Sequence, residues 1–218
     1  MEFKHSSKTL KLIREVSDFM QDFVHPAEEV YASEMKDFRE QGNPWQVPKI
    51  VGELKQKARD KGLWNFFLPE SDNGYGLTNL EYAPLAEMMG KIGFASEVFN
   101  CSAPDTGNME VLDKFGSDYQ KQEWLNPLLD GEIRSAFAMT EPKVASSDAT
   151  NIESSIEKDG NDYVINGEKW WTSGYGRPDC KVLIFMGITN PENPKHQRQS
   201  QILVPSDAPG IENLRMLN

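Results

Sequence analysis

The chain of 218 residues is poor in cysteine and histidine, with two of the former and three of the latter. Cys101 and Cys180 lie far apart in a composition without a disulfide framework, so we expect two reduced thiols in a reducing, cytoplasmic compartment. His5, His25 and His196 show none of the spacings at which side chains bind a metal. The sequence therefore predicts neither a disulfide nor a metal site.

Long apolar runs and an excess of positive charge are also missing. No apolar segment approaches the roughly 18 residues of a membrane-spanning helix, and the N-terminus lacks the apolar core of a secretory signal. The formal net charge is -11, and the scattered basic residues disfavour nucleic acid as a partner. The chain is 38% hydrophobic and 26% charged, which is enough for one large buried core or two small ones.

The first part of the sequence has the apolar spacing of helices. Between residues 10 and 24, apolar residues recur every three or four positions, and Pro26 is expected to end or kink this helix. A second helix is predicted over residues 48–61, with proline in its first turn and Gly62 as its C-cap.

Three further helices are predicted before residue 130. Thr78 and Glu81 have the spacing of a capping box, which indicates that a helix begins there. Residues 106–115 and 118–126 supply two shorter helices, and Pro127 is expected to stop the second.

After residue 134 the pattern changes to that of strands. Residues 135–140 predict a short strand, and residues 151–173 predict a three-stranded antiparallel meander with turns at Asp159-Gly160 and Asn166-Gly167. Further strands are predicted over residues 181–188 and 201–205. We therefore expect an α+β protein, with an N-terminal all-helical domain over residues 1–133 and an antiparallel β domain over residues 134–218.

The segment that follows the strand at 135–140 is unusually polar. Between Thr140 and Asn151 it carries hydroxyls, carboxylates and one amide. Such a loop can present hydroxyls and backbone N–H groups to a phosphate or a planar heterocycle. An Asx or Ser turn that satisfies its own backbone is an equal alternative.

Two adjacent tryptophans follow the second predicted turn. On a strand, Trp170 and Trp171 would point to opposite faces, so only one of them could join the core. The other would suit stacking beside an aromatic cofactor. Packing between the two domains is the alternative role.

Several motifs, taken together, resemble the acyl-CoA dehydrogenase family. The likeness extends from the first helix to about Gly210, and two stretches are similar to the branch of family members ten and eleven and their bacterial relatives. The family motifs are Met139-Thr-Glu-Pro142, Ser146-Ser-Asp148 and Asn166-Gly-Glu-Lys-Trp-Trp-Thr-Ser173, and the branch stretches are residues 100–111 and 144–152.

The resemblance implies an FAD site built from three segments. The strand ending in Thr-Glu-Pro lies against the flavin ring, the Ser-Asp loop meets the FAD pyrophosphate and the pantetheine of the substrate, and the Trp-Thr-Ser element stacks beside the ring. Ser147 is the residue also assigned to the substrate. The positions assigned to FAD are Phe137, Met139, Thr140, Ala145, Ser146, Ser147, Trp171, Thr172 and Ser173.

The resemblance also implies a reaction, the α,β-dehydrogenation of a fatty acyl-CoA. A carboxylate removes the α-proton while a hydride leaves the β-carbon for the flavin. The expected partners are the acyl-CoA, an electron-transfer flavoprotein or a similar acceptor, and further copies of the full-length chain in a homo-oligomer.

In the family the catalytic glutamate belongs to a third, C-terminal helical domain. We therefore expect no catalytic residue among these 218, which would form a fragment or split chain of the enzyme. Glu141, the acid beside the flavin strand, is interpreted as a structural acceptor. The alternative function is a non-catalytic interaction module derived from the family, and DNA-associated flavoprotein relatives are disfavoured by the acidic composition.

Overall fold

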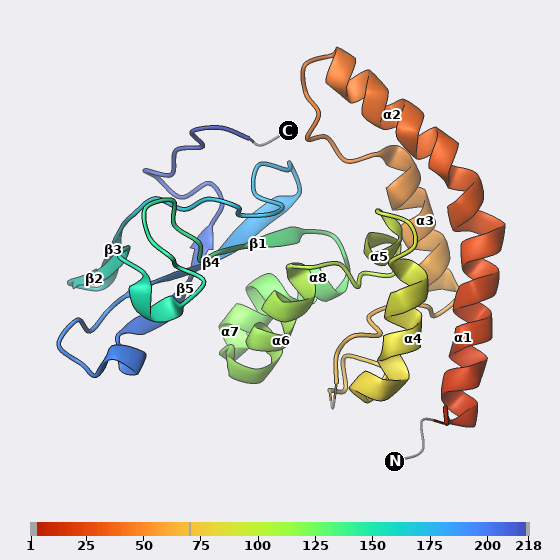
Figure 1. The fold of residues 1–218 in the computed structure, drawn as a ribbon, viewed down its shortest axis with the longest axis horizontal. Coiled ribbons are helices and arrows are strands. Elements are labelled where there is room, and N and C mark those ends of the chain that lie inside the picture. The colour runs from red at the N-terminus through yellow and green to blue at the C-terminus, as the bar shows by residue number, and fades with distance from the viewer. Residues whose placement is uncertain (1–3, 70, 217–218) are drawn as a thin grey trace. The chain divides into compact units, whose positions relative to one another are not determined.

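The computed structural model describes residues 4–69 and 71–216, and the chain forms two compact units that divide between Glu132 and Ile133. The first, the helical unit, contains only helices, and the second, the sheet unit, contains all the strands of the described residues (Figure 1). The predicted α+β order, a helical domain followed by a β domain, is thus confirmed. The division lies one residue before the expected boundary.

The helical unit opens with helical turns that run without interruption from Ser7 to Glu40. Ser6 begins them, because its hydroxyl accepts a hydrogen bond from the Thr9 amide at 3.2 Å. Pro26 does not end the run, since it lies in the first turn of a short 3-10 segment, where its missing N–H is not needed. The elements of this unit are α1 (Ser7–Phe19), η1 (Met20–Val24), η2 (His25–Ala27), α2 (Glu28–Glu40), α3 (Lys49–Asp60), α4 (Asn79–Met89), α5 (Ala95–Val98), α6 (Asp105–Phe115), α7 (Asp118–Gln120), η3 (Lys121–Leu125) and α8 (Asn126–Leu129).

Two of the predicted helix boundaries have different outcomes. The capping box is confirmed: the Thr78 hydroxyl accepts from the Glu81 amide, and the Glu81 carboxylate accepts from the Thr78 amide. The prediction that Pro127 stops a helix is wrong, because α8 continues to Leu129. Pro127 occupies the first turn of α8, a position that tolerates proline.

The core of the helical unit contains a cluster of phenylalanine rings. Phe19, Phe66 and Phe99 are almost completely buried, and the ring centroid of Phe99 lies 5.2 Å from that of Phe19 and 6.1 Å from that of Phe66. None of the helices among the described residues is long and apolar enough to cross a bilayer.

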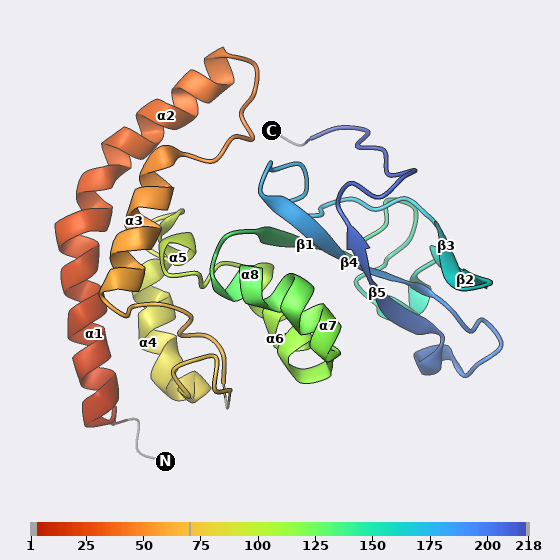
Figure 2. The same cartoon turned by 180° about the vertical axis from the view of Figure 1, so that it is seen from behind.

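The sheet unit is organised around β4, its longest strand. β1 pairs with the first part of β4, β2 meets its last residue, and β5 pairs with it antiparallel over residues 182–188 (Figure 2). The elements are β1 (Arg134–Ala138), η4 (Ala149–Asn151), β2 (Ser155–Asp159), β3 (Asp162–Asn166), β4 (Cys180–Ile188), η5 (Lys195–Gln197) and β5 (Gln199–Pro205). The sheet is mixed, not antiparallel as predicted, because β1 and β2 both run parallel to β4.

The predicted meander over residues 151–173 is also corrected. β2 and β3 form one antiparallel hairpin that turns between Asp159 and Asp162, and residues 167–172 form no return strand. Gly167 instead passes so close to Ser154 that a Cβ on the glycine would clash with the serine side chain. The Asn166-Gly167 pair therefore marks a close approach of two segments and not a hairpin turn.

Candidate functional site

The end of β1 and the segment after β3 lie side by side. The Trp170 amide donates a hydrogen bond to the Thr140 carbonyl at 2.9 Å. This bond joins Thr140 to Trp170, the sequence neighbour of Trp171, across about 30 residues of sequence. We use the name "wall" for the surface around this bond, made of Phe137, Met139, Thr140, Trp171, Thr172 and Ser173.

The β1 part of the wall has two unlike faces. Ala136 and Ala138 are 0% and 2% exposed and belong to the core of the sheet unit, together with Cys180. Because side chains alternate along a strand, Phe137 and Met139 lie on the opposite face, and both are half-buried. The sequence-predicted ring contacts of β1 are thus on its more open side.

Trp171 has an unusual backbone for so large a residue. Its φ is 54°, in the left-handed region, and its side chain is 63% exposed. Such a conformation costs of the order of 1–3 kcal/mol and persists only where surrounding contacts hold it. Trp170 is 40% exposed, and the two indole centroids lie 5.7 Å apart. The prediction that one tryptophan enters the core is therefore wrong, since residues 167–172 do not alternate as a strand.

The polar side chains of the wall are not used by the fold. Within the described part of the chain, no hydrogen bond partner is found for the hydroxyls of Thr140, Thr172 and Ser173. Thr140 and Thr172 are half-buried and Ser173 is exposed. These three hydroxyls are free to bind the polar edge of a ligand.

The Ser-Asp loop divides its polar groups between two uses. The Ser146 hydroxyl is 1% exposed and accepts from the Glu141 amide at 2.6 Å, so it closes the loop. The Asp148 carboxylate accepts from the amide and hydroxyl of Thr150 at 2.9 and 2.6 Å, which makes an Asx turn. Ala145 and Ser147 are exposed. The self-satisfying turn, one of the two readings of this loop, accounts for Ser146 and Asp148.

A buried ion pair lies directly behind the wall. Lys169 Nζ donates to Glu141 Oε1 at 2.7 Å and to the Met139 carbonyl at 2.9 Å, and the two charged side chains are 7% and 5% exposed. The Glu141 carboxylate also accepts from the amides of Glu153 at 2.8 Å and Ser154 at 3.0 Å. Glu141 is thus an acceptor within the fold, in agreement with its interpretation from the sequence.

The carboxylate of the ion pair is charged at neutral pH. Burial alone would raise the pKa of Glu141, but the hydrogen bonds from Lys169 and the two amides outweigh it and lower that pKa to about 2. Burial lowers the pKa of Lys169, and Glu141 opposes this change. The Lys169 ammonium also lies 4.8 Å from the ring centroid of Phe185. The sequence analysis missed Lys169, whose only signal was its position inside a family motif.

The cysteines give no reactive centre. Neither forms a disulfide and both are buried, and burial raises the pKa of the Cys101 thiol to about 12. No cluster of three or more metal-binding side chains occurs in the residues that the structure describes.

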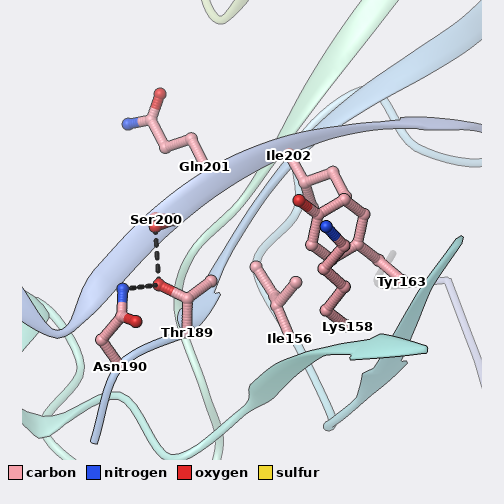
Figure 3. A pocket seen from close by; sticks show the side chains of 8 residues that line it. All are labelled: Ile156, Lys158, Tyr163, Thr189, Asn190, Ser200, Gln201 and Ile202. Atoms are coloured by element: carbon pink, nitrogen blue, oxygen red, sulfur yellow. Dashed lines mark hydrogen bonds between the residues drawn. The ribbon is translucent and has the colours of Figure 1, made fainter. Parts of the chain in front are cut away.

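A separate hollow of about 450 Å³ lies between the β2–β3 hairpin, the end of β4 and β5, and none of the wall residues lines it (Figure 3). Three of its polar side chains bond to one another: the hydroxyls of Thr189 and Ser200 are 2.7 Å apart, and the Asn190 amide donates to Thr189 at 3.0 Å. The other polar lining side chains are those of Lys158, Tyr163 and Gln201, and we assign the hollow no ligand.

Comparison with known families assigns both units. Residues 6–132 match the model of the acyl-CoA dehydrogenase N-terminal domain, and residues 136–218 match that of the middle domain. The chain belongs to the acyl-CoA dehydrogenase family. Within it, the chain is 55% identical over 218 residues to the probable acyl-CoA dehydrogenase FadE2 of Mycobacterium tuberculosis, and the match covers 99% of the chain and 52% of that protein.

The expected branch is confirmed by acyl-CoA dehydrogenase family member 10 of Mus musculus, which is 52% identical over 95% of the chain and 20% of its own length. A solved structure of a provisionally named acyl-CoA dehydrogenase from Mycobacterium abscessus has a TM-score of 0.92 and 50% identity, over 99% of this chain and 54% of that one. A glutaryl-CoA dehydrogenase from Mycobacterium smegmatis, solved with FADH2, shares the fold at a TM-score of 0.69 and 22% identity, over 94% and 47%. The chain thus spans about half the length of its bacterial relatives.

Proposed function

We propose that this chain supplies the flavin-ring side of the FAD site of an acyl-CoA dehydrogenase that acts on fatty acyl-CoA. The observation that carries the proposal is the hydrogen bond between the Trp170 amide and the Thr140 carbonyl. It brings together the two segments that the family resemblance assigns to the ring, and both present unused surface. The neighbour from Mycobacterium smegmatis, which has the same fold, binds FADH2.

The residues of the wall suit a flat heterocycle. The exposed indole of Trp171 offers a stacking surface, and the unpaired hydroxyls of Thr140 and Thr172 can bind the polar edge of a ring. In the Ser-Asp loop, Ala145 and Ser147 are exposed to a ligand, and Ser146 serves by closing the loop. FAD, when bound, supplies the electron-accepting ring, and the residues of the chain bind and orient it.

The proton-accepting carboxylate of the reaction is not Glu141. A base must be able to take up a proton near neutral pH, whereas hydrogen bonds and Lys169 hold the pKa of Glu141 at about 2. The resemblance places the catalytic glutamate in a third domain. We therefore propose that residues 1–218 bind FAD and that dehydrogenation, with an electron-transfer flavoprotein or similar acceptor and a homo-oligomeric assembly, belongs to the whole enzyme.

Titration of the purified chain with FAD tests the proposal. We expect quenching of flavin fluorescence and a stoichiometric flavin absorbance that stays with the protein through gel filtration. Thr140→Val and Trp171→Ala should each weaken binding, while Tyr163→Ala, an exposed aromatic on β3, is the matched control. A colourless chain that forms defined protein complexes would favour the interaction module instead. Reduction of a dye by the chain with acyl-CoA would contradict the assignment of the base.

A further inference from the structure

Four segments of the sheet unit meet at Glu141, through its carboxylate and its backbone amide. The first is the end of β1, which carries Glu141 itself, and the second is the segment that carries Lys169. The third is the stretch before β2, whose amides at Glu153 and Ser154 donate to the carboxylate. The fourth is the Ser-Asp loop, where the Ser146 hydroxyl accepts from the amide of Glu141. The carboxylate itself accepts three hydrogen bonds, from Lys169 and from the amides of Glu153 and Ser154.

Lys169 ties the two halves of the wall together. Its ammonium binds the carbonyl of Met139 and the carboxylate of Glu141, which flank Thr140 in sequence. Trp170, which follows Lys169, donates its backbone amide to the carbonyl of Thr140. Trp171 comes next, in its left-handed conformation. The ion pair is therefore one residue from Thr140 on the first segment and two residues from Trp171 on the second.

A purely stabilising role would not explain an ion pair at this place. Removing two charges from water costs free energy that their attraction often fails to recover, and well-packed apolar side chains often serve stability as well or better. Hydrogen bonds with fixed directions do what apolar packing cannot: they fix the orientation of the segments that they join. Behind the wall that orientation decides where the Trp171 indole lies.

We propose that the Glu141–Lys169 ion pair is the positioning element of the wall, holding the end of β1 and the Trp170–Trp171 segment in the arrangement that a flat ring contacts. This inference rests on the proposed function for the identity of the ring. It adds that two residues without assigned ligand contacts set the geometry of those that have them. Glu141 and Lys169 are positioning residues and not catalytic ones.

The test uses the full chain with two variants and a matched control. Lys169→Met removes one charge, and Glu141→Gln combined with Lys169→Met removes both, so that no buried charge is left unpaired if the single variant fails to fold. The control is Lys143→Met with Glu168→Gln. That pair joins the same loop to the same segment, but its atoms are 3.9 Å apart and its side chains are 78% and 48% exposed.

The readout is local to the wall. Indoles as close as those of Trp170 and Trp171 couple electronically, which gives an exciton couplet in circular dichroism, and Trp170→Phe identifies the couplet by abolishing it. We expect the double variant to unfold cooperatively, with its helical signal intact, but to lose the couplet. We also expect its FAD affinity to fall roughly tenfold or more, because small misplacements of binding groups have large effects.

The outcomes separate the two proposals. A couplet that survives in the double variant, or one that is lost without any change in FAD affinity, overturns the positioning role. If the wild-type chain binds no FAD, the proposed function fails, and the couplet still decides whether the ion pair positions the wall. Unchanged couplet and affinity in the control, with both lost in the double variant, support the inference.

Discussion

The helical unit contains a cluster of buried phenylalanines, whereas the sheet unit carries a pair of exposed tryptophans. Phe19, Phe66 and Phe99 of the helical unit are at most 2% exposed, whereas Trp170 and Trp171 of the sheet unit are 40% and 63% exposed. The helical unit gains stability by removing its rings from water. The sheet unit leaves its largest rings at the surface.

Buried polar groups show the complementary difference. In the helical unit one buried polar cluster connects neutral amides to the backbone: the Asn100 side chain donates to the Asn65 side chain at 2.7 Å and to the Leu128 carbonyl at 2.9 Å. In the sheet unit the corresponding group is charged, the ion pair of Glu141 and Lys169. Apolar packing is not directional, so a surface that must present rings at a fixed angle needs directional bonds behind it. The comparison teaches that the wall is built for geometry and the helical core for stability.

Truncation of a core ring should have the largest effect on stability. Phe99→Ala removes a completely buried ring that contacts Phe19 and Phe66, and we expect a loss of about 3–5 kcal/mol in the free energy of unfolding. Urea unfolding followed by circular dichroism measures it. Phe115→Ala is the control, since Phe115 is 73% exposed and its loss should cost less than about 0.5 kcal/mol. Equal losses for the two variants would contradict the contrast drawn above.

Breaking the ion pair from one side should come next. Lys169→Met leaves the Glu141 carboxylate buried without its cation, and we expect a loss of about 3 kcal/mol in the free energy of unfolding. The double variant with Glu141→Gln should recover most of that loss, because no charge remains buried. Chemical denaturation of both variants gives the two values. A double variant less stable than the single one would show that the pair contributes mainly stability.

The fold of each unit could be predicted from local patterns, but the pairing in the sheet unit could not. The capping box at Thr78 and the apolar run that becomes β1 are local signals, and both were interpreted correctly. The partner of β1 is β4, which begins 42 residues after β1 ends and pairs in parallel. No local pattern encodes such a pairing.

The candidate site was predictable by residue type and not by geometry. The family motifs identify the residues of the wall. The local pattern at Gly167 predicts a turn, but the reason for a glycine there is its close approach to Ser154, which lies 13 residues away in sequence. The exposure of both tryptophans follows from the positive φ of Trp171, and sequence patterns give no sign of that angle in a bulky residue. Lys169 was overlooked because its two acceptors lie about 30 residues earlier.

Acid should weaken the sheet unit through Glu141. The folded pKa of about 2 lies below the ordinary value of 4.5, so the stabilisation is complete above pH 4.5 and is lost as the pH falls from there towards 2. We expect a contribution of the order of 2 kcal/mol over this window. Unfolding of the wild-type chain and of the Glu141→Gln, Lys169→Met double variant should be compared at several pH values. The difference in free energy of unfolding between the two proteins should change with pH. If both free energies change with pH in parallel, Glu141 is not the source of the acid effect.

Truncation of the exposed indole should have the smallest effect on stability and a large one on binding. Trp171→Ala removes a ring that is 63% exposed, so we expect the free energy of unfolding to change by less than about 0.5 kcal/mol. If that ring stacks on the flavin, FAD affinity should fall by about 1–3 kcal/mol, as it does where an aromatic side chain stacks on a base. Urea unfolding and FAD titration of the same preparation give both numbers. A destabilised variant with unchanged FAD affinity would mean that Trp171 serves the fold, and the wall would then resemble the helical core more than the contrast between the units allows.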